Sequence, residues 1–254
     1  MGKRLGQHFL IDPEAARKIT ELLSIDSEDN ILEIGPGGGF LTSYLVESSA
    51  SVTAIELDAR LAERLINDSH ENLTVINADF LQTDLESLSF NKICGNIPYQ
   101  ICGRIIERVM RTGVQWKKCV LMLPDGVAQR AAAGPGMPEY SFLSVMCGAT
   151  GDAKIEFMVN REDFDPAPKI NSFVISITRK TGPLSGNFYK LVKAAFSSKR
   201  KKLRNSLSIY FARPASDMAR LITAGGIRPD IRPQNIDIPG FKKLLKVFEN
   251  EGIL

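Results

Sequence analysis

The pattern of apolar and polar positions predicts alternating strands and helices through most of the chain. Short apolar runs that stop abruptly at a polar residue or a glycine are typical of buried strands. The segments between these runs carry apolar residues at helical spacing, which gives a βαβ rhythm and predicts a largely parallel sheet. The predicted strands cover residues 31–34, 51–56, 73–78, 92–95 and 118–123. Ahead of them, Asp12 and Pro13 are typical of a helix start and predict a helix through Leu23.

The second part of the chain departs from this rhythm. Two further strands, at 155–159 and 172–178, follow each other without a long helix, so we expect an antiparallel hairpin at the sheet edge. A linker with glycine and proline covers 180–186, and beyond it the pattern is helical to the end. The sequence therefore predicts an α/β fold in two domains, residues 1–180 with the sheet and residues 187–254 as a small all-helical domain.

Composition places the chain among ordinary globular proteins. It has 254 residues, of which 44% are hydrophobic and 24% charged, enough for one large domain with a small appendage. No apolar run approaches the ~20 residues that a membrane span needs, and no targeting segment precedes the predicted fold, so we expect a cytoplasmic protein. The four cysteines lack paired spacing and the two histidines are isolated, which predicts reduced core thiols and no metal site.

The net charge of +3 is unevenly distributed. Residues 181–254 contain 14 Lys and Arg against 5 Asp and Glu, a local charge of +9, whereas residues 1–180 contain 18 and 24, a charge of −6. An acidic body with a basic C-terminal quarter indicates a polyanionic partner that approaches from one side. The densest basic run contains Lys199, Arg200, Lys201, Lys202 and Arg204. We interpret this run as an RNA-binding surface; the alternative is an ordinary solvated helix face.

The first predicted strand, residues 31–34, runs into a glycine-rich turn and then a helix. Such a turn places backbone N–H groups at the start of the helix, where the polar end of a ligand can bind. Gly37 and Gly39 lack a Cβ, so they would leave room for a ligand against the backbone. A glycine turn is also compatible with tight packing alone, and both interpretations stand at this point.

Acidic residues at the ends of neighbouring strands favour the ligand. Glu56 closes the second strand about twenty residues after the turn, where a carboxylate can accept hydrogen bonds from both ribose hydroxyls of a nucleoside. This geometry fits NAD and S-adenosylmethionine alike. Glu33, before the first glycine, would repel a pyrophosphate but suits the cationic end of S-adenosylmethionine. Asp79 and Phe80 could hold and stack an adenine, so the pattern favours S-adenosylmethionine.

The segment Asn96-Ile97-Pro98-Tyr99 is the sharpest chemical signal, because it follows the end of the fourth strand on the ligand-binding side. An exocyclic amine of a base is a poor nucleophile, and two acceptors can turn its lone pair toward a methyl donor. The Asn96 side-chain oxygen and the Ile97 carbonyl can be these acceptors. Pro98 fixes the turn, and Tyr99 offers a face for the base. The alternative is a plain turn with a packed tyrosine.

Taken in order, these motifs resemble the KsgA-type small-subunit ribosomal RNA adenine N6,N6-dimethyltransferases over nearly the whole chain. The segments that carry the resemblance are 5–10, 33–37, 56–58, 79–80, 96–99, 164–172, Phe196 and 199–207. The resemblance implies a seven-stranded, Rossmann-like class I methyltransferase sheet and a small helical domain. It also implies methyl transfer from S-adenosylmethionine to N6 of two adjacent adenosines near the 3′ end of small-subunit rRNA, during ribosome biogenesis.

The same resemblance implies roles for individual residues. Those that it places around S-adenosylmethionine are His8, Leu10, Gly35, Glu56, Asp79 and Asn96. Those at the base are Asn96, Ile97, Pro98, Tyr99 and Phe164. Phe164 is expected to be a second stacking face, with a loop anchor in the core as the alternative. The chain departs from the family at 123–126, where a Gln-x-Glu-like segment is usual, and this affects how the adjacent loop supports the adenine pocket.

Three functions remain compatible with the sequence. The first, which we predict, is rRNA dimethylation by a monomer that acts on a structured, partly assembled small subunit. The second is a related antibiotic-resistance methyltransferase of large-subunit rRNA, which residues 201–207 argue against. The third is a non-catalytic RNA- or DNA-binding factor that keeps the fold, which the intact set of Glu56, Asp79 and 96–99 argues against.

Overall fold

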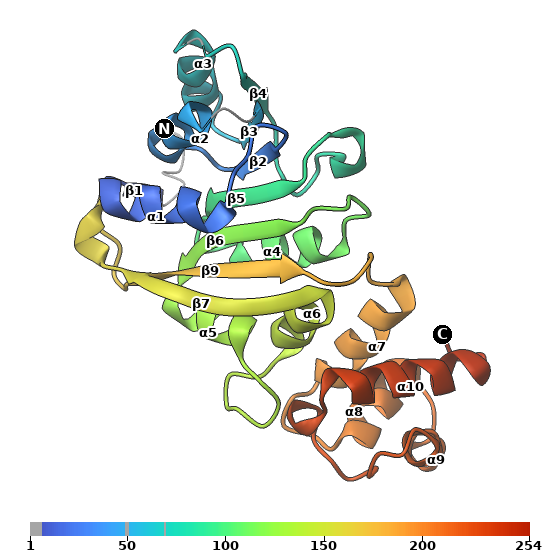
Figure 1. Ribbon diagram of the computed structural model, residues 1–254. Helices are drawn as coiled ribbons and strands as arrows, with labels where there is room; N and C mark the ends of the chain where they lie inside the picture. Colours follow the sequence, from blue (N-terminus) through green and yellow to red (C-terminus); the bar gives the residue numbers. More distant parts are fainter. Residues whose placement is uncertain (1–6, 49–50, 69) are drawn as a thin grey trace. The chain divides into compact units, whose positions relative to one another are not determined.

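The computed structural model of the chain describes residues 7–48, 51–68 and 70–254 (Figure 1). The segment at 5–10, which carries part of the family resemblance, is described from Gln7 onward, and its first two residues lie outside the described residues. Within the described ranges, no helix is long and apolar enough to cross a membrane.

The chain forms two compact units. The first contains residues 1–129 and 151–183, and the second contains residues 130–150 and 184–254. The predicted domain division near 180–187 stays a proposal. Residues 130–150, which the sequence pattern assigned to the first domain, group with the second unit by their packing.

A seven-stranded sheet forms the centre of the first unit, in the order β4-β3-β2-β5-β6-β9-β7 (Figure 1). The strands are β2 (Asn30–Ile34), β3 (Ser51–Glu56), β4 (Leu73–Asn77), β5 (Lys92–Asn96), β6 (Lys118–Pro124), β7 (Gly151–Val159) and β9 (Ser172–Arg179). The first five pair in parallel, and β9 pairs antiparallel with both β6 and β7. The predicted parallel sheet with an antiparallel hairpin is confirmed, with β7 at the edge because β9 inserts beside β6.

Helices cover both faces of this sheet. They are α1 (Pro13–Leu23), α2 (Phe40–Glu47), α3 (Ala59–Asn67) and α4 (Cys102–Arg111), and α5 (Asp125–Ala132) follows β6. The helix start predicted at Asp12 is confirmed, because its carboxylate accepts hydrogen bonds from the backbone N–H groups of Glu14 and Ala15, each at 3.1 Å. Ile19 of α1 and Leu45 of α2 belong to one core cluster with side chains of β6. Figure 1 shows α1 in front of the sheet and α4 behind it.

A second, two-stranded sheet joins the start of the chain to a loop far along the sequence. In this sheet β1 (Phe9–Leu10) pairs antiparallel with β8 (Phe164–Asp165), which follows the short 3-10 helix η2 (Arg161–Asp163). The sequence patterns did not predict this sheet, because two-residue strands carry no periodicity. It places the segment before α1 beside the loop between β7 and β9.

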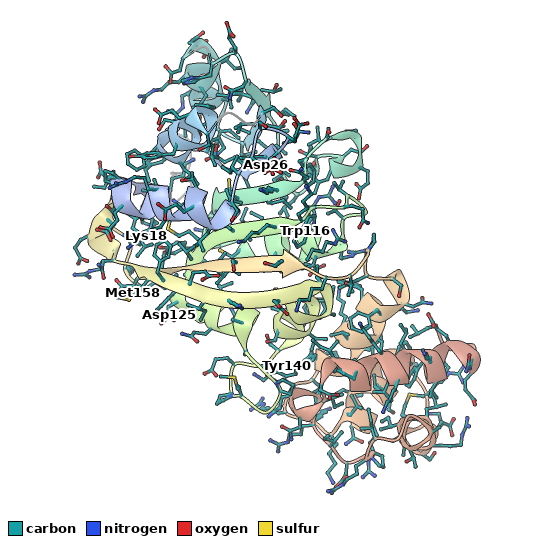
Figure 2. All side chains as sticks on the ribbon, viewed as in Figure 1. Lys18, Asp26, Trp116, Asp125, Tyr140 and Met158 are labelled. Carbon is teal, nitrogen blue, oxygen red and sulfur yellow. The ribbon has the colours of Figure 1, made fainter. Side chains whose placement is uncertain are left out.

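The second unit is helical in its described residues. Its helices are α6 (Phe142–Thr150), α7 (Gly186–Phe196), α8 (Leu203–Phe211), α9 (Ala215–Ala224) and α10 (Ile238–Asn250), with a 3-10 helix η3 (Pro233–Asn235). Aromatic rings form much of the core, since the Phe196 ring centroid lies 6.2 Å from that of Tyr140 and 6.1 Å from that of Phe241. Tyr140, labelled in Figure 2, is 1% exposed and donates its hydroxyl to the Ile236 carbonyl at 3.0 Å. The helical C-terminal region is therefore as predicted.

The four cysteines form no disulfide and are buried, as their apolar surroundings in the sequence predicted. Burial raises the pKa of Cys147 to about 12 and that of Cys94 well above its ordinary value. Both thiols are therefore protonated at neutral pH and serve as small apolar core residues.

Candidate active site

The side chains singled out in the sequence gather at one edge of the sheet. Strands β2 to β5 are parallel, so the residues at their carboxyl ends are neighbours in space. Glu33 lies at the end of β2 just before Gly35, Glu56 ends β3, Asp79 comes just after β4, and Asn96 ends β5. The order β4-β3-β2-β5 puts the glycine turn in the middle of this group.

The glycine turn adopts backbone conformations that other residues rarely adopt. Gly35, Gly37 and Gly39 have φ values of 66°, 59° and 84°. A Cβ added at Gly35 would meet nothing within 4 Å, so the backbone there is open to a ligand. At Gly37 and Gly39 it would lie 2.8 Å from Phe9 and 2.6 Å from Leu65. The prediction of free space was therefore wrong at these two glycines, because protein side chains fill it.

Glu56 is held by the turn that it faces. It is 3% exposed, its Oε2 accepts a hydrogen bond from the Gly37 N–H at 3.0 Å, and its Oε1 accepts one from the Asp58 N–H at 2.8 Å. The Gly35 N–H donates to the Ile55 carbonyl at 2.9 Å, which fixes the turn against β3. A carboxylate oxygen can accept more than one hydrogen bond, so this fixed carboxylate retains the capacity to accept hydroxyl donors beside the turn.

Glu33 lies beneath the turn and is 1% exposed. Its Oε2 accepts a hydrogen bond from the Thr42 hydroxyl of α2 at 2.7 Å. Burial raises the pKa of Glu33 to about 7; the Thr42 hydrogen bond opposes this shift, and the negative charge of Glu56 adds to it. Glu33 therefore links β2 to α2 through its hydrogen bond to Thr42, and it offers no exposed surface to a ligand.

Asp79 follows β4, the strand at the end of the sheet, and two apolar residues, Leu57 and Phe80, are its candidate partners in an adenine pocket. The Asp79 carboxylate accepts hydrogen bonds from the Leu81 N–H and the Gln82 side-chain amide, both at 2.9 Å. Phe80, for which the sequence predicts adenine stacking, is 5% exposed and lies in the core. Leu57, the residue after β3, is 53% exposed and so presents an apolar side chain to solvent. The sequence patterns did not single out Leu57, although an apolar residue directly after a strand-ending acid is a usable signal.

Asn96 is held in one orientation by the N-terminal segment. Its Nδ2 donates to the His8 carbonyl at 2.8 Å, which leaves its side-chain oxygen without a partner among the described residues. His8 is fixed in turn by a hydrogen bond between its Nδ1 and the Pro166 carbonyl at 2.7 Å. Since a carbonyl only accepts, Nδ1 carries the proton when the imidazole is neutral. The pairing of β1 with β8 thus orients the Asn96 amide.

Tyr99 lies beside this pair and is half-buried. Its hydroxyl is hydrogen-bonded to the buried hydroxyl of Ser172 at 2.7 Å, and its ring centroid lies 5.5 Å from that of His8. Burial raises the pKa of Tyr99 above its ordinary value, so the phenol stays neutral. The Cys102 thiol, a weak donor, lies 3.2 Å from the Pro98 carbonyl oxygen and 3.6 Å from that of Ile97, so the Ile97 carbonyl keeps acceptor capacity.

The path of this turn depends on a glycine. A Cβ added at Gly95 would lie 2.4 Å from the carbonyl oxygen of Ile34, so only glycine lets β5 approach β2 this closely. After Asn96 the chain turns, and the Pro98 carbonyl accepts a hydrogen bond from the Ile101 N–H at 3.1 Å just before α4 begins. The four residues 96–99 therefore form an ordered turn at the end of β5.

Leu10 and Phe164 belong to the core. They face each other across the β1–β8 pair and are 4% and 3% exposed. This burial favours the core-anchor alternative for Phe164, and its stacking on a base stays a prediction. For Leu10, whose side chain is equally buried, contact with a ligand would have to come from the backbone.

The basic run belongs to the second unit, at the start of α8. Leu203 and Leu207 are fully buried and anchor the helix, as expected. The side chains of Lys199, Arg200, Lys201 and Lys202 are exposed, and that of Arg204 is half-buried. Residues 199–202 lie in the turn before α8 and Arg204 lies in the first turn of the helix, so the run is an exposed positive surface at the start of α8. Its contact with RNA stays a prediction.

Three similarities connect this chain with proteins of known activity. The model of the ribosomal RNA adenine dimethylase family matches residues 1–228. Ribosomal RNA small subunit methyltransferase A of Streptococcus pneumoniae is 32% identical over 269 residues, which cover 99% of this chain and 93% of that protein. The solved dimethyladenosine transferase of Plasmodium falciparum has a TM-score of 0.83 and 26% identity, and the match covers 96% of this chain and 98% of that one.

A further solved structure shares the fold. The 23S rRNA methyltransferase ErmE has a TM-score of 0.70 at 24% identity, with 95% of this chain and 99% of that one covered. At this identity the likeness supports the Rossmann-like methyltransferase fold and leaves the choice of ribosomal subunit open.

Proposed function

Because the chain belongs to the ribosomal RNA adenine dimethylase family, we propose that it methylates N6 of two adjacent adenosines near the 3′ end of small-subunit rRNA. It is an rRNA adenine dimethyltransferase, and the proposal concerns which adenosines it modifies and which residues do the work. The observation that carries the residue assignment is the turn at 96–99, where Asn96 presents an unpartnered oxygen next to Tyr99 at the ligand-binding edge.

S-adenosylmethionine fits the residues around the glycine turn. Gly35 leaves open space against the backbone, and Glu56 presents a fixed carboxylate that can accept the ribose hydroxyls. Leu57 offers an exposed apolar side chain and Asp79 a carboxylate, which suit the face and the edge of an adenine. His8, just before β1, and Leu10 of β1 complete the proposed set. When bound, S-adenosylmethionine supplies an electrophilic methyl group on a sulfonium.

Asn96 and Ile97 orient the target amine. Two acceptors that hold the two N–H protons of an adenine N6 turn its lone pair out of the ring plane, toward the methyl donor. The Asn96 oxygen is preset for this role, because His8 occupies the other end of the amide. The gain is one of alignment, which in well-oriented systems supplies several kcal/mol of the barrier.

Tyr99 provides the surface on which the base lies. Its ring is fixed at one end by the Ser172 hydroxyl and flanked by His8, so little freedom is lost when a base stacks on it. The neutral phenol is no base at physiological pH. No strong base is required, because a sulfonium is an excellent leaving group and the proton on the methylated amine can pass to water afterwards.

The substrate we propose is a structured, partly assembled small subunit. The acidic body of the chain repels phosphates, and the basic run at 199–204 can neutralise only a few of them. Selection of particular adenosines must then depend on RNA shape that presents them unpaired. A folded ribosomal surface provides this and naked rRNA does not.

Labelled S-adenosylmethionine incubated with unmethylated small subunits, followed by nucleoside analysis, tests this proposal. We expect N6,N6-dimethyladenosine at two neighbouring positions, with much less label in naked small-subunit rRNA. Large subunits provide the matched control. Label in large-subunit rRNA alone, or in naked rRNA as fast as in subunits, would contradict the proposed substrate.

A further inference from the structure

The exposed side of α4 carries a stripe of arginines. Cys102, Ile105, Ile106, Val109 and Met110 are buried against the sheet. Arg104, Arg108 and Arg111 are spaced four and three residues apart, so they follow one another along a single face of the helix. α4 begins three residues after Tyr99, and the stripe therefore starts next to the turn proposed to hold the target base.

This stripe forms one wall of a surface cavity beside α4. The cavity has a volume of about 390 Å³, and its lining also includes Leu81, Leu85, Glu86, Glu107 and Thr112. The opposite wall is the segment after Asp79 that contains the 3-10 helix η1 (Leu85–Ser87). One end of the cavity thus adjoins the carboxyl edge of the sheet.

The two carboxylates of the cavity are already engaged. Glu86 accepts hydrogen bonds from the Thr112 hydroxyl at 3.1 Å and the Gly113 N–H at 3.0 Å, and the backbone bond lowers the pKa of Glu86. Glu107 forms an ion pair with Arg111 at 3.8 Å. Three arginines against two acids leave the cavity positive within a sheet domain that is acidic as a whole.

Two of the arginines retain unused donors. Arg108 donates through Nη2 to the Thr83 carbonyl, but its Nε is buried and has no hydrogen-bond partner in the described structure. A buried donor on a charged group without a partner is costly, so the Arg108 side chain gains free energy when it reorients to pair with an anion in the cavity. Arg104 is exposed and forms no ion pair or hydrogen bond with the described residues.

We propose that this cavity binds backbone phosphates of the substrate RNA strand next to the target adenosine. The inference rests on the proposed function, because the position of the RNA strand follows from the proposal that Tyr99 holds the target base. Successive side chains of the stripe rise by about 4.5–6 Å along the helix, so they can follow a strand over more than one phosphate. Arginine suits this role, since its planar fork pairs with phosphate oxygens. The sheet domain then has an RNA-binding surface of its own, separate from the basic run at 199–204.

The test compares the variants R104A, R108M and the double variant with wild type on unmethylated small subunits. If the cavity binds phosphate, KM for subunits should rise about tenfold in the double variant, while kcat at saturation and S-adenosylmethionine affinity stay close to wild type. The slope of log Kobs against log salt should become shallower by about 0.7 for each phosphate that the variant no longer neutralises. E107Q, which removes an opposing charge, should shift KM in the other direction.

The matched control is R64A, which removes an exposed arginine of α3 in the same unit that forms no ion pair with the described residues. It should leave KM and the salt slope unchanged. The inference is overturned if R104A with R108M has the KM and salt slope of wild type, or behaves like R64A. The single variant R104A provides a test even if the double variant misfolds, because the Arg104 side chain is exposed and its removal should not disturb folding. If the wild-type protein does not methylate small subunits, the proposed function fails, and the inference about the cavity is not what has been contradicted.

Discussion

The buried carboxyl of Glu33 should make the stability of the protein depend on pH in a window set by its pKa. Its pKa is raised to about 7 in the folded chain, against 4.5 for an ordinary glutamate. Between these two values the folded state holds a proton that the unfolded state has released. The free energy of unfolding therefore falls as pH rises through this window, and above about pH 7 the folded state carries a buried charge.

The size of the effect follows from the shift. About 2.5 pKa units at about 1.4 kcal/mol each correspond to roughly 3 kcal/mol lost between pH 4.5 and 7.5. Glutamine has nearly the same shape and does not titrate, and it can still accept the hydroxyl of Thr42. E33Q should therefore lack this part of the pH dependence, with its largest advantage over wild type above pH 7.

Urea unfolding of wild type and E33Q at several pH values from 5 to 8.5 measures this difference directly. Other groups titrate equally in both proteins, so only the gap between the two curves is informative. A second variant, T42V, removes the hydrogen bond that favours the charged form, and it should extend the falling region to higher pH. Parallel curves for wild type and E33Q would show that Glu33 is not raised to this degree, and would refute the argument from burial.

Four further predictions concern the active site and its partner. Glu56→Ala should weaken S-adenosylmethionine binding by about 1.5–3 kcal/mol in a folded protein, because charge-assisted hydrogen bonds are lost; unchanged affinity in titration calorimetry would remove Glu56 from the site. The Asn96→Ala variant should bind subunits normally, but the rate constant for methyl transfer in single-turnover assays should fall strongly. An effect on KM alone would contradict an aligning role. Tyr99→Phe should keep most activity and lose about 1 kcal/mol of stability, since the buried Ser172 hydroxyl loses its partner; activity as low as in Tyr99→Ala would mean that the hydroxyl itself is needed. Replacing residues 200–202 with alanine should weaken subunit binding and flatten its salt dependence without changing cofactor affinity, and an unchanged salt slope would identify the basic run as a solvated face.

Local patterns in the sequence determined the elements that carry the site. Apolar runs predicted the strands, and Asp12 predicted the start of α1. The glycines predicted a tight turn, because glycine readily adopts the positive φ values found there. Glu56 and Asn96 fall at strand ends by position alone, and parallel strands bring their carboxyl ends together. These features depend on neighbours within a few residues, so a single sequence displays them.

Only the tertiary structure decided how those residues are oriented. The hydrogen bond from Asn96 to His8 and that from His8 to Pro166 join segments separated by most of a domain, and no periodic pattern encodes such a meeting. Packing also decided that Phe9 fills the space at Gly37, and that Phe164 lies in the core. Burial and partner choice arise from how distant segments pack, so the sequence specified the chemistry available at this edge, and the fold decided which atoms remain free to use it.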